Sequence, residues 1–211
     1  MPILLEDIPS HYGSSFVAIH YAADLYLMER FLKPYYDPSD RPLVMAVGGG
    51  RNESLINIAY HEKNFTESAK NPILVGCNIS QRTAWEIEKY NEFVAGPDSG
   101  DGTNSMVWKQ LAYKTTGLSE DGQYNLAYFR APDIDGNIDA WFRVLSQASY
   151  QVCKGGVIFM ITTAGDSDAH DEIIEKVCRS NLPTELVHTD ITNVTGHSAT
   201  THYKCATFVG K

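Results

Sequence analysis

The sequence predicts a single α/β domain built on a mostly parallel sheet. Apolar runs such as Leu43–Val47 and Ile73–Cys77 alternate with segments of helical spacing, an order that gives parallel strands joined by right-handed crossovers. The 211 residues are enough to bury one sizeable core. Near the C-terminus, Glu185–Ile191 and Tyr203–Val209 are separated only by a polar turn, which predicts an antiparallel hairpin.

The first forty residues are expected to form a helical segment in front of the sheet. Residues 14–32 repeat apolar side chains with the spacing of one buried helix face, and the helix is expected to stop before Pro34. The residues of that face are Tyr21, Leu25, Met28 and Leu32. We therefore divide the chain into an N-terminal helical segment, 1–40, and an α/β domain, 41–211, which make one domain overall.

Five strands and four helices are expected to alternate after residue 41. The predicted strands are Leu43–Val47, Ile73–Cys77, a segment near Met106 to Tyr113, Leu126–Phe129 and Val157–Ile161. The predicted helices start near Ser54, at Ser80, at Ile138 and at Asp168, where Ser80 and Asp168 act as N-terminal caps. The turn Lys154-Gly155-Gly156 is expected to end the third helix and lead into the fifth strand.

Composition narrows the possible partners and location. The formal net charge of −9 disfavours a broad grip on nucleic acid, because phosphate binding needs clustered Lys and Arg. Neither a membrane span nor a signal pattern is visible, so a cytoplasmic protein is expected. The four cysteines lie far apart and are expected to be buried, reduced thiols. His188, His197 and His202 lack a carboxylate or cysteine at ligand spacing, so no metal site is expected.

The first candidate binding feature is the glycine turn that follows the first strand. Gly48, Gly49 and Gly50 carry no side chains, so a nucleotide-like ligand can approach the backbone and the N-terminus of the next helix. Three glycines after a strand also occur in a plain strand-to-helix connection, so this motif needs support from the rest of the chain.

That support comes from five stretches in register. Together they resemble the class I S-adenosylmethionine-dependent methyltransferases, which have a Rossmann-like fold with a seven-stranded sheet and a C-terminal antiparallel hairpin. The stretches are Val44–Gly50, Ile73–Ser80, Leu118–Leu126, Val152–Met160 and Tyr203–Lys211. The resemblance covers nearly the whole chain from residue 41 and implies that S-adenosylmethionine is the cofactor.

The same resemblance implies a cofactor site in which several acids are replaced. Its residues would be Gly48, Gly49, Gly50, Asn78, Ile79 and Phe129. Family members carry an acid in the first strand, at the end of the second strand and at the start of the fourth, where this chain has Ala46, Asn78 and Asn125. A charged acceptor makes stronger hydrogen bonds to ribose hydroxyls than an amide does, so weakened binding is expected.

Catalytic residues are harder to predict, because methyl transfer needs mainly alignment and sometimes a general base. Asp133 and Asp135 follow the fourth strand at the edge where open α/β sheets bind ligands, and Tyr12 could stack over the cofactor. Each also has an ordinary interpretation as a loop or surface residue. Arg130 could pair with Asp133 or with an acidic substrate.

Methyl transfer from S-adenosylmethionine to an unidentified small-molecule or macromolecular acceptor is therefore the leading functional hypothesis. Phe129–Asp133 and Gly50–Leu55 are loosely similar to tRNA guanine-N7 methyltransferases, although the net charge fits tRNA poorly. A catalytically silent fold used for binding or as a scaffold is the alternative, motivated by the missing acids. A Rossmann-like oxidoreductase is disfavoured, since the glycine turn lacks GxGxxG spacing.

Overall fold

The computed structural model describes a mixed α/β fold over most of the chain. The described residues are 23–38, 41–47, 51–66, 68–70, 72–78, 107–110, 122–130, 132, 134, 138–163, 167–195 and 200–211. Several sequence predictions lie outside them: the glycine turn at 48–50, the helix from Ser80, and the tip of the C-terminal hairpin at 196–199.

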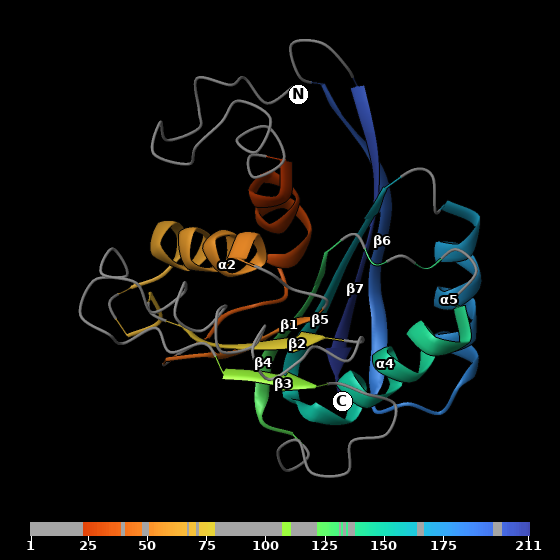
Figure 1. Ribbon diagram of the computed structural model, residues 1–211, viewed down its shortest axis with the longest axis horizontal. Helices are drawn as coiled ribbons and strands as arrows, with labels where there is room; N and C mark the ends of the chain where they lie inside the picture. Colours follow the sequence, from red (N-terminus) through yellow and green to blue (C-terminus); the bar gives the residue numbers. More distant parts are fainter. Residues whose placement is uncertain are drawn as a thin grey trace.

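One mixed sheet organises the described chain, in the strand order β3-β2-β1-β4-β5-β7-β6 (Figure 1). Its strands are β1 (Leu43–Val47), β2 (Ile73–Asn78), β3 (Val107–Gln110), β4 (Tyr124–Arg130), β5 (Val152–Thr163), β6 (Thr184–Thr195) and β7 (Thr200–Gly210). The pairs from β3 to β5 are parallel, whereas β7 is antiparallel to both β5 and β6. The expected α/β, Rossmann-like class with a mixed sheet is confirmed.

The predicted central strands are confirmed as neighbours. Leu43 pairs with Ile73 and Val44 pairs with Leu126, so β1 lies between β2 and β4. Every described β1 side chain from Val44 to Val47 is buried, as expected for a parallel strand with helices on both faces.

Helices cover both faces of the sheet and enclose two cores. One face carries the N-terminal helix, residues 23–32, which ends in the π-helical turn η3 (Met28–Leu32), together with α2 (Arg51–Asn64). The other face carries α4 (Ile138–Gln151) and α5 (Ser167–Arg179). Figure 1 shows the two helix pairs on opposite sides of the strands. This three-layer arrangement leaves the strand ends as the places where a ligand can reach the sheet.

Two local predictions are corrected. The turn expected at residues 154–156 lies inside β5, where α4 passes directly into Val152 and Gly155 adopts a positive φ of 76°. The register of β4 with β5 shifts there, from Tyr124 opposite Val152 to Leu126 opposite Val157, so the glycines form a bulge and not a helix cap. Asp168 lies within the first turn of α5, which begins at Ser167.

Two further expectations about burial need revision. In the N-terminal helix the buried residues are Ala23, Asp24, Leu27, Met28, Phe31 and Leu32, whereas Leu25 is half-buried. These positions keep the three- and four-residue spacing of an amphipathic helix, but the buried face is centred on Asp24, Leu27 and Phe31, so Leu25 lies at its border. Among the described cysteines, Cys205 is buried but Cys153 is half-buried and Cys178 is exposed, and all three are free thiols.

Candidate functional site

The candidate site lies at the carboxyl ends of the parallel strands, where the chain changes direction across the sheet. After β1 the chain moves outward to β2 and β3, then returns to place β4 on the other side of β1. Open α/β sheets bind ligands at such a switch point, outside the carboxyl ends of the strands. Here Val47 at the end of β1 lies opposite Phe129, and Asn78 ends β2 opposite Gln110.

An ion pair joins this edge to the N-terminal helix. Arg130 is the last residue of β4, and its Nε lies 2.6 Å from Oδ2 of Asp24. The Asp24 side chain is 3% exposed and the Arg130 side chain 20%. A carboxylate this deeply buried needs a charged partner, so the pair fixes the helix against the end of β4. Asp133, a predicted partner of Arg130, lies outside the described residues, so that pairing and the pairing with an acidic substrate stay predictions.

The predicted cofactor residues are only partly described. Asn78 ends β2, and Phe129 is fully buried on β4 with its ring centroid 6.3 Å from that of Trp141 on α4. Gly48, Gly49, Gly50 and Ile79 lie outside the described residues, as do the catalytic candidates Tyr12, Asp133 and Asp135. Their roles stay predictions.

The positions at which this chain lacks the acids of the family lie in different parts of the sheet. Ala46 lies in the middle of β1 and is completely buried in the core beneath the N-terminal helix and α2. Asn125 lies at the amino end of β4, where its Oδ1 accepts a hydrogen bond from the backbone N–H of Leu43 at 2.9 Å. Asn125 therefore joins β4 to the start of β1, at the opposite edge of the sheet from the carboxyl ends. The lack of a charge at Asn125 is therefore not evidence for weak cofactor binding.

A second polar group at the carboxyl edge was missed by sequence reasoning. Thr162, near the end of β5, places its Oγ1 2.6 Å from Nδ1 of His170 on α5, and both side chains are fully buried. Burial, reinforced by the nearby Lys204 ammonium, lowers the pKa of His170 to about 4. Lys204 on β7 is itself ion-paired with Asp171. These residues connect α5 to β5 and β7.

In the sequence, only the spacing between Thr162 and His170 could have indicated their contact. A polar residue at the end of an apolar strand, followed eight positions later by a histidine on the next helix, suggests contact across a strand-to-helix turn. No such local signal exists for Asp24 and Arg130, which are 106 positions apart.

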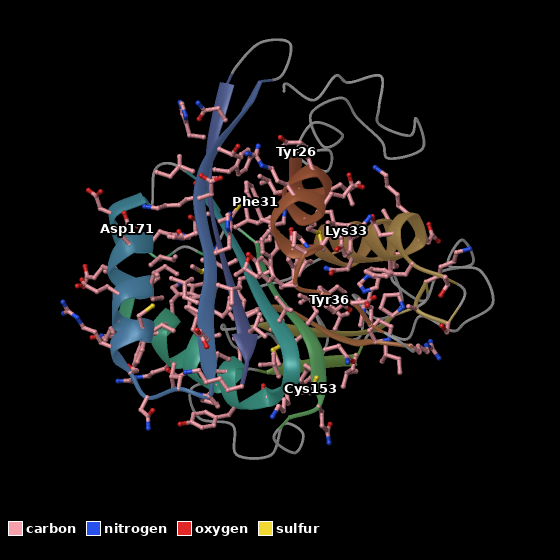
Figure 2. The ribbon with its side chains drawn as sticks, turned by 180° about the vertical axis from the view of Figure 1, so that it is seen from behind. Tyr26, Phe31, Lys33, Tyr36, Cys153 and Asp171 are labelled. Carbon is pink, nitrogen blue, oxygen red and sulfur yellow. The ribbon has the colours of Figure 1, made fainter. Side chains whose placement is uncertain are left out.

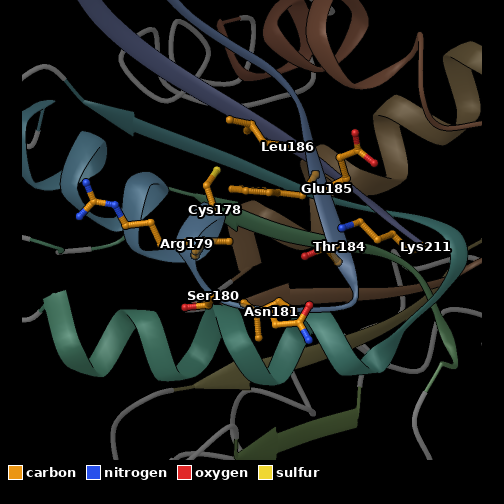
Figure 3. Close-up of a pocket in the computed structure, with 11 residues that line it drawn as sticks. Cys178, Arg179, Ser180, Asn181, Thr184, Glu185, Leu186 and Lys211 are labelled. Carbon is orange, nitrogen blue, oxygen red and sulfur yellow. The ribbon is translucent and has the colours of Figure 1, made fainter.

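A separate pocket lies at the opposite edge of the sheet. It has a volume of about 530 Å³ and is formed between the end of α5, the start of β6 and the end of β7. Figure 3 shows Cys178, Thr184 and Lys211 around it. Because β7 is antiparallel to β5, its last residues lie at the amino end of β5. This pocket is therefore remote from the switch point.

Among the described residues, no helix is long and apolar enough to cross a membrane. In the same parts of the chain, no group of three or more His, Cys, Asp or Glu side chains is arranged to hold a metal ion.

Comparisons with known proteins identify the fold. No protein family profile and no curated protein sequence matches the chain. Among solved structures, magnesium protoporphyrin IX methyltransferase (ChlM) from Synechocystis PCC 6803 with bound S-adenosylmethionine is similar at TM-score 0.56 and 11% identity, over 94% of this chain and 86% of ChlM. The N-methyltransferase NodS from Bradyrhizobium japonicum gives TM-score 0.56 and 12% identity, over 91% of this chain and 96% of NodS.

The chain thus has the fold of the class I S-adenosylmethionine-dependent methyltransferases. The [4+2]-cyclase SpnF is also similar, with TM-score 0.57 and 9% identity over 92% of this chain and 81% of SpnF. Proteins with different named activities therefore share this fold, and function has to be argued from the site.

Proposed function

We propose that the protein transfers a methyl group from S-adenosylmethionine to an acceptor that is not yet identified. The observation that carries the proposal is the switch point between β1 and β4, at which α2 begins four residues beyond the end of β1. A helix N-terminus next to a strand end offers backbone N–H groups and a favourable potential for a carboxylate. S-adenosylmethionine carries such a carboxylate on its amino-acid part.

Each predicted cofactor residue has a place in this proposal. Gly48, Gly49 and Gly50 connect β1 to α2 and leave room for the ligand. Asn78 ends β2 and Ile79 follows it, where a ribose would lie. The Asn78 amide can accept one ribose hydroxyl through its oxygen and donate through its nitrogen. Phe129 is a buried residue near the end of β4, and its ring packs on the side of the sheet that faces α4.

The chemistry required of the protein is mainly alignment. When bound, S-adenosylmethionine supplies an activated methyl group on a sulfonium. This chain has to hold the acceptor in line with that methyl and exclude water. Asp133, Asp135 and Tyr12 remain the candidates for orienting or deprotonating the acceptor. The pair of Asp24 with Arg130 keeps the N-terminal helix beside the same strand ends.

The alternative hypothesis, a catalytically silent fold, is weakened at one of its three supporting positions. It rested on three missing acids, but Asn125 makes a structural hydrogen bond at the amino edge of the sheet. Only Asn78 lies at a position where lost charge would weaken cofactor binding directly. We further propose that the complete sheet is the seven-stranded sheet of the family with a C-terminal hairpin, in a cytoplasmic protein divided at residue 40.

Calorimetric titration with S-adenosylmethionine and S-adenosylhomocysteine tests the proposal, with NADH as the matched dinucleotide control. Binding of both sulfur ligands without binding of NADH is expected. Absence of binding at millimolar ligand would overturn the proposal. Binding of NADH alone would favour an oxidoreductase. If both sulfur ligands bind, a screen for methyl transfer from labelled cofactor separates an enzyme from a silent fold.

A further inference from the structure

The first turn of α5 is attached to the sheet by two neighbouring side chains. Nδ1 of His170 lies 2.6 Å from Oγ1 of Thr162 near the end of β5, and the Asp171 carboxylate is ion-paired with Lys204 on β7. Thr162 and Lys204 are themselves paired residues of these two strands. Figure 1 shows α5 alongside the strands, on one face of the sheet. Consecutive residues of the helix therefore hold a cross-strand pair at the carboxyl edge of β5.

This turn depends on polar contacts more than the later turns of α5 do. Between Asp168 and Asp171, only the His170 side chain is fully buried, whereas Ala169 is half-buried and both acids are exposed. The buried apolar residues of the helix start one turn later, at Ile173, Ile174 and Val177. Loss of the His170 contact therefore loosens the first turn without removing the apolar packing of the rest of the helix.

The surroundings of His170 can satisfy its neutral ring but not its charged form. A neutral imidazole has one N–H, whereas the protonated ring has two. Oγ1 of Thr162 can accept one of them while the hydroxyl donates to the backbone carbonyl of Lys204, 3.3 Å away. Nε2 of His170 is buried without a hydrogen-bond partner, so the second N–H stays unsatisfied. A buried charged donor with no acceptor is strongly unfavourable.

The charges that face His170 come from β7 and from α5 itself. The Lys204 side chain is 8% exposed, and its ammonium repels a second cation, whereas the Asp171 carboxylate attracts one. From β5 the ring meets the uncharged Thr162. The other charged side chains on the adjoining turns of α4 and α5 are exposed to solvent: Asp139, Arg143, Asp168 and Glu172. Burial, reinforced by Lys204, holds the pKa of His170 at about 4.

We propose that the first turn of α5, residues 167–171, is an acid-sensitive latch, which is closed on β5 and β7 while His170 is neutral and opens when the ring binds a proton. In the open state both N–H groups of the charged ring reach water, so no buried donor is left unsatisfied. The later turns stay packed, which keeps the change local. The latch lies at the carboxyl edge of β5, beside the candidate site, and it does not depend on the proposed function.

Hydrogen exchange of the full chain at pH 7 and pH 5, followed by mass spectrometry, tests the proposal. The amides of residues 171–174 bond to the carbonyls of 167–170 in an α-helix, so their protection reports opening of the turn. In the open turn His170 titrates near its ordinary pKa of 6.5 and not near 4, which raises the open population about twentyfold between pH 7 and pH 5. After correction for intrinsic exchange, protection at these amides should fall by that factor and stay below the protection of β1, which reports global unfolding.

Two variants assign the effect to His170. His170→Asn removes the titrating ring but keeps an amide that can bond to Oγ1 of Thr162, so protection at 171–174 should be the same at both pH values. His61→Gln, on the other face of the sheet, is the matched control and should keep the twentyfold fall at these amides. If His170→Asn does not fold, the wild-type comparison decides. Wild-type protection that is independent of pH, protection at 171–174 equal to that of β1 at both pH values, or a full fall in His170→Asn would overturn the proposal.

Discussion

Arg130 at the carboxyl end of β4 is ion-paired with Asp24, a residue 106 positions earlier in the chain, with 2.6 Å between Nε and Oδ2. The pair joins the N-terminal helix to the strand end nearest the switch point. Asp24 is nearly inaccessible to solvent, so its carboxylate depends on Arg130 for compensation.

Asp24→Asn should therefore lower the free energy of unfolding by about 2–3 kcal/mol, less than a fully buried pair because Arg130 is 20% exposed. Urea unfolding measures this change. Glu175→Gln is the control, since Glu175 pairs with Arg179 on the exposed surface of α5 and such pairs contribute less than about 1 kcal/mol. Equal effects of the two substitutions would show that the Asp24 pair does not hold the helix in place.

Gly50→Leu should abolish ligand-induced thermal stabilisation. Gly50 belongs to the turn between β1 and α2, where the proposed cofactor approaches the backbone, and a leucine side chain would fill that space. In the wild type a ligand at about 100 times its Kd stabilises the fold by about 2.7 kcal/mol. Lys154→Leu, at an exposed position near the amino end of β5, is the control and should keep the full shift. A normal shift in Gly50→Leu would place the ligand elsewhere.

Restoring an acid at two asparagines separates a cofactor role from a structural one. Asn78→Asp should tighten S-adenosylmethionine binding by up to about 1–2 kcal/mol, since a carboxylate makes stronger hydrogen bonds to ribose hydroxyls. Asn125→Asp should leave affinity unchanged, because Asn125 bonds to Leu43 at the amino edge. Calorimetry on both variants gives the comparison. A gain at Asn125 without a gain at Asn78 would contradict the placement of the site.

The parts of the fold that sequence predicted are those in which burial requires a repeating pattern. β1 and residues 157–161 of β5 are buried on both faces, so both appear as unbroken apolar runs. The bulge at residues 153–156 was mistaken for a helix-ending turn, because two adjacent glycines are typical of both. The prediction for the N-terminal helix shares Met28 and Leu32 with the observed buried face but misses Asp24, because a buried acid cannot be recognised from an apolar pattern.

The site was less predictable, because its contacts join distant parts of the chain. Nothing near Arg130 in sequence indicates Asp24, and an acid between Ala23 and Leu27 looks like an ordinary helix residue. Asn125 was grouped with the cofactor positions by resemblance, although the start of a parallel strand lies at the opposite edge from its end. The direction of each strand shows which residues lie at the carboxyl edge, where a cofactor can bind, and which lie at the amino edge.

Gly156→Ala should be strongly destabilising, whereas Gly155→Ala should cost less. A Cβ at Gly156 would lie 2.7 Å from the carbonyl oxygen of Tyr124 and 2.9 Å from that of Cys153, so the backbone of the bulge would have to move. Gly155 has open space around its Cβ position, and alanine there incurs only the strain of a positive φ, about 1–2 kcal/mol. In the view of Figure 2, Cys153 lies in the lower half of the molecule, well below Tyr26 of the N-terminal helix.

Denaturant unfolding of both glycine variants measures the difference. Because the bulge is remote from the switch point, any Gly156→Ala protein that folds should keep its affinity for S-adenosylmethionine. A larger loss for Gly155→Ala than for Gly156→Ala would show that the bulge is not packed as tightly as these distances require.

His61 is fully buried on α2 and makes the stability of the protein depend on pH. Its Nδ1 donates to the carbonyl of Asn57 at 2.6 Å, which leaves Nε2 to accept from the Tyr36 hydroxyl at 2.9 Å. The bond to Tyr36 requires the neutral ring, whereas Nδ1 of a protonated ring could still donate to the Asn57 carbonyl. Burial lowers the pKa of His61 to about 4, although the bond to Asn57 opposes this shift.

The folded protein therefore binds fewer protons than the unfolded chain between about pH 4 and the ordinary histidine pKa of 6.5. Stability contributed by the neutral ring is present above pH 6.5 and is lost as the pH falls toward 4. For His61 the loss between pH 7 and pH 5 is about 2 kcal/mol. His170, with its pKa also lowered to about 4, adds a similar loss.

Urea unfolding at pH 7 and pH 5 tests this for the wild type and His61→Gln. The glutamine variant loses stability at both pH values, but that loss cancels in the difference between them. The difference should therefore be smaller than in the wild type by about 2 kcal/mol. His202→Gln is the control for exchanging a histidine for a glutamine, because His202 is exposed on β7 beside Asn193. An unchanged difference in His61→Gln would mean that His61 is protonated in the folded protein, with its bond to Tyr36 rearranged.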